Sequence, residues 1–297
     1  MREEKPLSAP NELERAFLGL DADGRPKPGV YEDVPADLYH SLPLVSSSAL
    51  RTVLTGSYRK ARQERFSDLA PTPAMVLGSA IHLAVLEPGY LRSRTVVIKD
   101  LRSKANKEAA AQARAAGKLV LTPEQLQIAE QVGQSCWSDP DCPEWGQLMS
   151  RAKYKEVTLI WDEGPVRCKA RLDCMDPAWG LIVDVKTSGA ISPRDMQRKL
   201  FNHGLDIQAA FYTDGAINLG INVRSYVIAA IATDGTGELA CYELSDETLQ
   251  AGRDRYKPIL HGWAECEKTG RWPSRVRGIR LLSHERWALN RIYEGEE

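Results

Sequence analysis

The chain has 297 residues, of which 43% are hydrophobic, and a formal net charge of −1 from 39 basic and 40 acidic residues. This length and apolar content are enough for a full hydrophobic core, which excludes a disordered chain, and the balanced charge excludes a uniformly basic nucleic-acid-binding surface. No apolar run is long enough to span a bilayer and the N-terminus has no signal-peptide core, so we expect a cytoplasmic protein with no membrane contact.

The first half of the chain is predicted to be mainly helical. Residues 1–37 are rich in proline and predict a loosely structured lead rather than a domain. Thr122, Pro123 and Gln125 have the pattern of a capped helix start. The elements expected between these two segments are two helices, a strand and an alanine- and lysine-rich helix, over residues 48–64, 74–87, 95–99 and 101–118.

Alternating polar and apolar residues predict a three-stranded meander over residues 156–186. If the second hairpin has an even-length loop through residues 176–179, Asp173 and Asp184 lie on the same face, with Lys186 beside Asp184. Leu172, Val183 and Val185 would then point the other way, into the core. Two close carboxylates repel each other unless a cation lies between them, and hard oxygen ligands suit Mg²⁺ or Mn²⁺. A solvated strand face with paired charges is the alternative.

His82 is the conspicuous polar residue of the expected helix over residues 74–87, which is apolar around its whole circumference and should therefore be buried. Gly78 lies one turn earlier on the same face and leaves room for another backbone or a ligand. Neutral imidazole is a reasonable third metal ligand beside two aspartates. The alternative is a histidine that is only hydrogen-bonded within the core.

A second helix carries Gln208 and Tyr212 one turn apart, after an expected N-cap at Asp206. An amide and a phenol at this spacing can hold a phosphate oxygen or a neighbouring catalytic side chain, although an amphipathic helix edge shows the same spacing. Glu156 enters the predicted sheet near the other acids, and an exposed acid at a strand start is the alternative for it. Strands are also expected over residues 224–233 and 238–244, before a helix over 246–267.

Taken in order, these motifs resemble the PD-(D/E)XK nuclease superfamily, in the branch of the phage and prophage exonuclease VIII (RecE-like) type. The resemblance covers about residues 39–212, including a serine-rich lead-in before the first helix, and it departs from the commoner pattern only in having Asp184 where glutamate is usual. It implies an α+β fold with a restriction-endonuclease-like core, in which a mixed central sheet is flanked by helices. The motifs are Gly78-x-x-x-His82, Glu156, Arg171-x-Asp173, Asp184-x-Lys186 and Gln208-x-x-x-Tyr212.

The resemblance also implies roles for these residues. Lys186 would orient or deprotonate the attacking water or steady charge on the phosphate. The residues that would bind Mg²⁺, with Mn²⁺ as a substitute, are His82, Asp173, Asp184 and the carbonyl of Val185.

Other residues would surround this centre. Gln208 and Tyr212 would position the scissile phosphate or Lys186, and Glu156 would be an auxiliary carboxylate. Arg171 is placed to grip a phosphate beside the metal. The further residues expected to contact DNA are Arg51, Arg59 and Lys60, for which a solvated helix face is the alternative.

The six cysteines contain no Cys-x-x-Cys pair, and neither a P-loop nor a dinucleotide-binding glycine motif is present. We therefore expect free thiols, no iron–sulfur cluster and no nucleotide cofactor. By resemblance, residues 38–270 would form the nuclease domain, and residues 271–297 a C-terminal extension that packs on the core or at an oligomer interface.

The resemblance implies a Mg²⁺-dependent exonuclease that acts 5′ to 3′ on the ends of linear double-stranded DNA and leaves 3′ single-stranded overhangs for phage-type recombination. It also implies a homo-oligomeric ring, a RecT-like single-strand annealing protein as partner, and a phage or prophage gene expressed in a bacterial cytoplasm. The alternatives are a structure-specific or restriction-like endonuclease on the same core, and a DNA-binding factor with a vestigial site.

Overall fold

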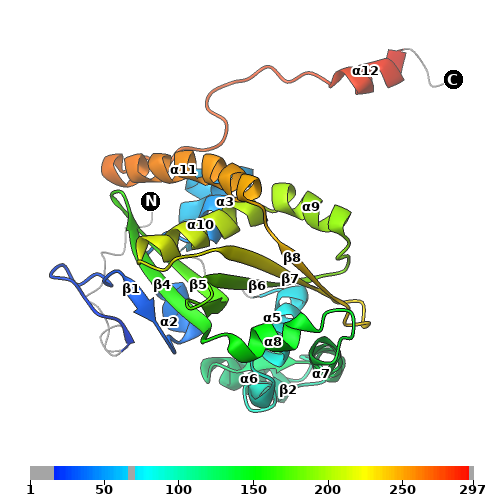
Figure 1. Ribbon diagram of the computed structural model, residues 1–297. Coiled ribbons are helices and arrows are strands. Elements are labelled where there is room, and N and C mark those ends of the chain that lie inside the picture. The colour runs from blue at the N-terminus through cyan, green and yellow to red at the C-terminus, as the bar shows by residue number, and fades with distance from the viewer. Residues whose placement is uncertain (1–16, 66–70, 294–297) are drawn as a thin grey trace.

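The structure, a computed structural model, describes residues 17–65 and 71–293, so that residues 1–16 of the predicted lead and the last residues of the C-terminal extension lie outside it (Figure 1). A six-stranded sheet in the order β1-β4-β5-β6-β7-β8 forms its centre. β6 and β7 are parallel, and the other neighbours are antiparallel. The strands are β1 (Gly29–Tyr31), β4 (Tyr154–Glu163), β5 (Val166–Asp176), β6 (Leu181–Ser188), β7 (Ser225–Ala232) and β8 (Leu239–Glu243).

Helices cover both faces of this sheet, which confirms the predicted α+β fold with a mixed central sheet (Figure 1). On one face lie α3 (Ser47–Thr55), α4 (Tyr58–Arg65), α9 (Pro193–Asn202), α10 (Leu205–Asn218) and α11 (Asp246–Thr269). On the other lie α5 (Pro73–Leu86), α7 (Pro123–Trp137) and α8 (Glu144–Arg151), with α6 (Lys104–Ala115) and a small parallel sheet of β2 (Thr95–Val97) and β3 (Leu119–Leu121) further out. The remaining elements are α2 (Ala36–Ser41), the 3-10 turn η1 (Pro88–Tyr90) and α12 (Arg286–Tyr293).

Local sequence signals set several helix starts, where a serine or threonine side chain caps the first turn. The Thr122 side chain accepts from the Gln125 amide and the Gln125 side chain accepts from the Thr122 amide, so the predicted capping box is present. The expected helix over residues 48–64 is two helices, because the chain bends at Gly56. The predicted cap at Asp206 is wrong: Gly204, with φ of 64°, precedes the helix, and Asp206 lies buried in the first turn, where it pairs with Arg255.

Two core clusters lie on the two faces of the sheet. One contains Leu172 with the buried side of α10, and the other contains Val183 and Val185 with the buried side of α5. The sequence predicted that Leu172, Val183 and Val185 share one face, which is wrong for Leu172. The reason is an interruption of the central strands at Glu156, whose φ is 52°.

The close contact of α10 with α11 depends on Gly252. A Cβ atom built on Gly252 would lie 2.2 Å from the backbone oxygen of Asp206, which does not yield without separating the helices. We expect Gly252→Ala to lower the free energy of unfolding by about 2 kcal/mol, as overpacking does elsewhere. The measurement is chemical denaturation followed by circular dichroism.

The matched control is Gly146→Ala in α8, where a Cβ atom would meet nothing within 4 Å. Because alanine favours the helix over glycine, this control should be neutral or slightly stabilising. Equal losses in the two variants would contradict the close-packing explanation.

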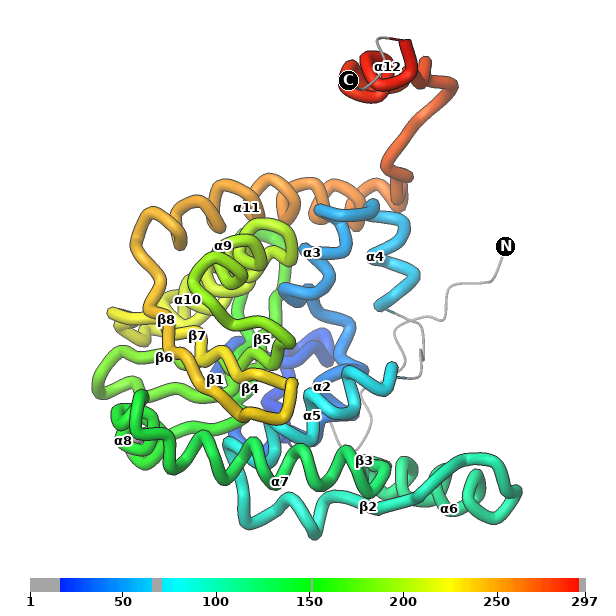
Figure 2. Tube along the Cα trace, turned by 90° about the vertical axis from the view of Figure 1, so that its right-hand side faces the viewer, coloured from blue at the N-terminus to red at the C-terminus, as the bar shows by residue number. Residues whose placement is uncertain are grey.

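The described N-terminal segment packs against the sheet, whereas the chain after α11 extends away from the body. β1 pairs with β4 at one edge of the sheet, and Leu18 and Val34 are buried beside it. The chain after α11 leads to α12, which stands clear of the body in both views (Figure 2). Among the described residues, no helix has the length and apolar character needed to cross a bilayer.

Candidate active site

The site lies where the hydrogen-bonded ladders of the central strands are interrupted. β4 and β5 pair on either side of one position, with Lys155 opposite Cys174 and Val157 opposite Leu172, and this register sets Glu156 against Asp173. Glu156 has φ of 52°, a left-handed conformation that costs a non-glycine residue about 1–3 kcal/mol. The side-chain alternation therefore changes here, and strained backbone brings two carboxylates to one point.

β6 continues the same row. Cys174 pairs with Val183 and Asp176 with Leu181, so the predicted hairpin register, in which Asp173 faces Asp184, is present. Instead of a ladder bond at that position, the Val185 amide donates to Asp173 Oδ2 at 2.7 Å. Three acids, one from each of three neighbouring strands, thus lie in a row across the sheet.

His82 reaches this row from α5. Its Nε2 lies 2.9 Å from the Val185 carbonyl, to which it donates because a carbonyl oxygen only accepts, and its Nδ1 lies 3.8 Å from Asp173 Oδ1. Gly78, one turn earlier, is close enough to β6 that a Cβ atom there would lie 3.2 Å from the Thr187 hydroxyl. α5 therefore lies close to β6, the strand that carries Asp184 and Lys186.

Potential metal-ligating atoms of His82, Glu156 and Asp173 lie within 4.8 Å of one another. Burial, together with the charges of Asp184 and Glu156, raises the pKa of Asp173 to about 6, while His82 and Lys186 oppose the rise. The positive charges nearby therefore do not compensate for burial and for repulsion by the other acids. The donor set and this electrostatic deficit fit a divalent cation.

Asp184 and Lys186 form an ion pair beside this group. Asp184 is buried, and its Oδ1 accepts a hydrogen bond from Gln208 Nε2 at 2.8 Å. Lys186 Nζ also lies 3.5 Å from the Val185 carbonyl. Gln208 therefore orients the acid of the motif, as expected for an amide that holds a neighbouring catalytic side chain, and that side chain is Asp184 rather than Lys186.

Tyr212 lies one turn further along α10, and its hydroxyl is 3.4 Å from the Ser47 hydroxyl at the start of α3. Burial and the charge of Asp184 raise the pKa of Tyr212, so the phenol stays protonated and can donate. Sequence reasoning noted the serine-rich start of this helix but did not identify Ser47 as a neighbour of the site. Only the packing of α3 on α10 shows it.

Arg171 has partners within the protein. Its Nε donates to Glu156 Oε2 at 2.6 Å and its Nη1 to the Val34 carbonyl at 2.8 Å, and its guanidinium lies 5.9 Å from the centroid of the Tyr39 ring. The same ring carries Lys169 Nζ at 4.6 Å. Arg171 thus holds the strained Glu156 in place. The sequence did not identify Tyr39 as a neighbour of the site.

The other residues expected to contact DNA also have contacts within the protein. Arg51 Nη1 is 3.5 Å from the His203 carbonyl, and a Cβ atom on Gly204 would lie 3.0 Å from the Arg51 side chain. Arg59 Nε donates to the Trp272 carbonyl, and Lys60 pairs with Glu64 one turn away. Contact of these three residues with DNA therefore stays a prediction.

The strain at Glu156 can be separated from its charge by two variants. Glu156→Gly and Glu156→Ala both remove the carboxylate and its bond to Arg171, but only glycine adopts a positive φ without cost. We expect the glycine variant to be more stable than the alanine variant by about 1 kcal/mol, and both to lose activity. Thermal unfolding of the two variants measures the difference, and an alanine variant at least as stable as the glycine variant would contradict the strain.

Comparison with known proteins gives one family and a related fold. A family described as a PDDEXK-like domain of unknown function (DUF3799) matches residues 46–285. The crystal structure of a "Putative exonuclease" from Eubacterium rectale superposes with a TM-score of 0.56 at 18% sequence identity, covering 85% of this chain and 94% of its own. The crystal structure of SSO0001 gives a TM-score of 0.28 at 13% identity, covering 64% of this chain and 87% of its own. A comparison with curated proteins gave no significant match.

The predicted resemblance to the PD-(D/E)XK superfamily is therefore confirmed, and the likeness to the exonuclease structure shows a shared fold. The family match covers most of the chain, including every residue of the acidic row. The chain belongs to the family of this PDDEXK-like domain.

Proposed function

We propose that this protein is a metal-dependent deoxyribonuclease that hydrolyses phosphodiester bonds in DNA. The observation that carries the proposal is the convergence of His82, Glu156 and Asp173 on one point beside the Asp184–Lys186 ion pair. A divalent cation bound here, Mg²⁺ or Mn²⁺, would supply a hydroxide at neutral pH and relieve charge on the reacting phosphate.

The protein's own residues would prepare the remaining steps. Lys186, held beside Asp184, presents an ammonium group that can orient the attacking water or steady a phosphate oxygen. Gln208 fixes the Asp184 carboxylate, and the protonated Tyr212 can donate to a phosphate oxygen. The ligands that we propose for the cation are His82, Glu156, Asp173, Asp184 and the carbonyl of Val185.

The finer proposal is an exonuclease that acts on ends of linear double-stranded DNA, 5′ to 3′, and leaves 3′ overhangs for phage-type recombination. The resemblance to the exonuclease VIII (RecE-like) type supports it, as does the fold shared with the E. rectale protein described as a "Putative exonuclease". The same resemblance supports a homo-oligomeric ring, a RecT-like annealing partner and a cytoplasmic location in a bacterial host. A restriction-like endonuclease on the same core is the second candidate function.

The test uses end-labelled linear duplex and covalently closed circles, each incubated with Mg²⁺, with Mn²⁺ and with EDTA. We expect degradation of the linear duplex alone, in the presence of metal, with a 5′ label released before a 3′ label on the same strand. Equal attack on circles would contradict the exonuclease proposal in favour of the endonuclease. Attack on neither substrate would contradict the nuclease proposal.

A further inference from the structure

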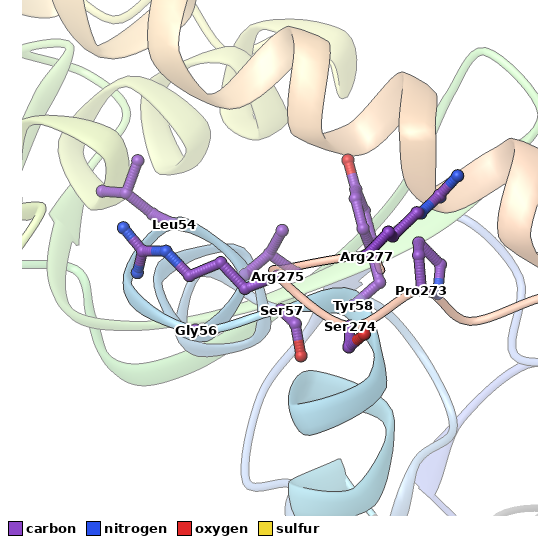
Figure 3. Close-up of a pocket in the computed structure, with 9 residues that line it drawn as sticks. Leu54, Gly56, Ser57, Tyr58, Pro273, Ser274, Arg275 and Arg277 are labelled. Carbon is purple, nitrogen blue, oxygen red and sulfur yellow. The ribbon is translucent and has the colours of Figure 1, made fainter. Parts of the chain in front are cut away.

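The chain that follows α11 is held firmly where it leaves the body. The Trp272 ring packs edge-on against Trp263, with centroids 5.0 Å apart, and Arg59 Nε donates to the Trp272 carbonyl at 3.3 Å. Arg275 donates to the Thr55 carbonyl at the end of α3, beside the cavity shown in Figure 3. The segment that follows, residues 276–293, is called the C-terminal arm below. Because its root is fixed, the arm leaves the body in a defined direction.

The arm exposes large apolar side chains. Ile279, Leu281 and Leu282 are more than nine-tenths exposed, and Trp287 and Tyr293 are 65% and 81% exposed. In both views α12 stands beyond α11, away from the body (Figures 1 and 2). Proteins rarely leave this many large apolar side chains of one short segment in water, so the arm is expected to be covered by another surface.

The arm is also basic. It contains four arginines against one described acid, Glu285. Arginine and tryptophan together are typical of the residues that contribute most to binding at protein interfaces. The surface that covers the arm must therefore be both apolar and acidic. The arginines of the arm are Arg277, Arg280, Arg286 and Arg291.

A surface of this kind exists elsewhere on the molecule. A cavity of about 530 Å³ lies at the β8 edge of the sheet, between the α7–α8 loop, the β6–α9 loop and the β7–β8 turn. Its apolar lining includes Ile191, Leu239 and the ring of Tyr242. Among the residues that the structure describes, no lysine or arginine lines it, and five carboxylates do. They belong to Asp139, Asp141, Asp195, Asp234 and Glu238.

These carboxylates have no basic partner among residues 17–65 and 71–293. Their hydrogen bonds come instead from their own loops: Asp139 accepts from the Asp141 amide, Asp195 from Ser192, and Asp234 from Thr236. Five like charges around one cavity repel one another, and an arriving cation relieves that repulsion. The cavity is therefore complementary to the arm in both charge and polarity.

We propose that the arm of one copy of this chain docks in the acidic cavity of a second copy. The cavity includes the α7–α8 loop, and α7 and α8 cover the face of the sheet opposite to α11, beyond which α12 lies (Figures 1 and 2). This separation favours a second molecule over the arm's own cavity. Arg280 and Arg286 pair with the carboxylates, and Trp287 covers the apolar lining.

The contact joins two different surfaces, so it is heterologous, and repeated copies close into a ring or extend as a filament. It therefore gives a physical basis for subunit association that does not depend on the nuclease proposal. Its test needs no DNA and no metal.

The test is sedimentation velocity of the full chain over a range of concentrations. The wild-type chain should associate. The double variant of the arm is Arg280→Glu with Arg286→Glu, and the double variant of the cavity is Asp234→Lys with Glu238→Lys. Each double variant should weaken association at least ~100-fold. Mixing these two double variants should restore assembly, because the acidic arm of the first variant binds the basic cavity of the second. The unchanged arm of the second variant binds the unchanged cavity of the first. Lys107→Glu with Arg114→Glu on α6 makes the same charge change elsewhere and should leave association unchanged.

Circular dichroism of each variant shows whether it is folded. A wild-type chain that stays monomeric at all concentrations, including one whose arm is bound to its own cavity, would overturn the proposal. So would association that neither reversal weakens, or a mixture that does not reassemble.

Discussion

Replacing Asp184 with asparagine is expected to reduce DNA hydrolysis by about 10³-fold, the loss seen when one preorganised electrostatic group is removed from an active site. Asparagine keeps the volume of the side chain and can still accept from Gln208 Nε2, but it loses the negative charge that pairs with Lys186 and would face the cation. The measurement is the initial rate on end-labelled linear duplex under saturating metal.

The control is Asp254→Asn on α11, an exposed position where the same chemical change lies away from the acidic row. It should keep full activity. DNA binding by the Asp184→Asn protein should persist, because the charge that is lost is negative. A variant with wild-type rates would show that the nuclease reading of this site is wrong and would favour a vestigial DNA-binding factor.

The metal-free protein is expected to lose stability as pH rises from about 4 to about 6, because of Asp173. Its pKa is raised from the model-peptide value of 3.8 to about 6 in the fold, so the folded state favours the protonated form. The favourable contribution is fully present below the unfolded pKa and is lost as pH rises through the folded one. Asp173→Asn removes this loss, and at pH 8 the variant should be more stable than the metal-free wild type by about 3 kcal/mol.

The measurement is urea unfolding of both proteins in EDTA between pH 5 and pH 8. Their difference should grow with pH, and saturating Mg²⁺ or Mn²⁺ should remove it by stabilising only the protein that retains the carboxylate. The Asp173→Asn protein should be inactive although it is more stable. A difference that does not change with pH would contradict the raised pKa.

Two neighbouring positions of the site lower the stability of the protein. Glu156 is held in a left-handed conformation and Asp173 is a partly buried acid with like charges nearby. Arg171 and the Val185 amide hold the two carboxylates in place. Strain and repulsion at one point are typical of sites that bind a charged ligand.

Much of the fold follows from local sequence. The capping box at Thr122 and the hairpin register that sets Asp173 against Asp184 were both predictable, because short-range backbone chemistry decides them. The motif order also predicted the family. Periodicity failed where Leu172 was placed with Val183, because it assumes an uninterrupted strand and the ladder is broken at Glu156.

By itself, then, the sequence determined the elements, their order and the residue types of an acidic site, since these depend on neighbours a few positions away. Tertiary structure decided which of those residues meet. It brought Glu156 rather than Asp184 to within 4.8 Å of both His82 and Asp173, assigned Gln208 to Asp184, and turned Arg171 and Arg59 toward the protein. These outcomes depend on one strained residue and on the packing of α5 and α10 against the sheet, and no pattern along the chain records the distances that such packing creates.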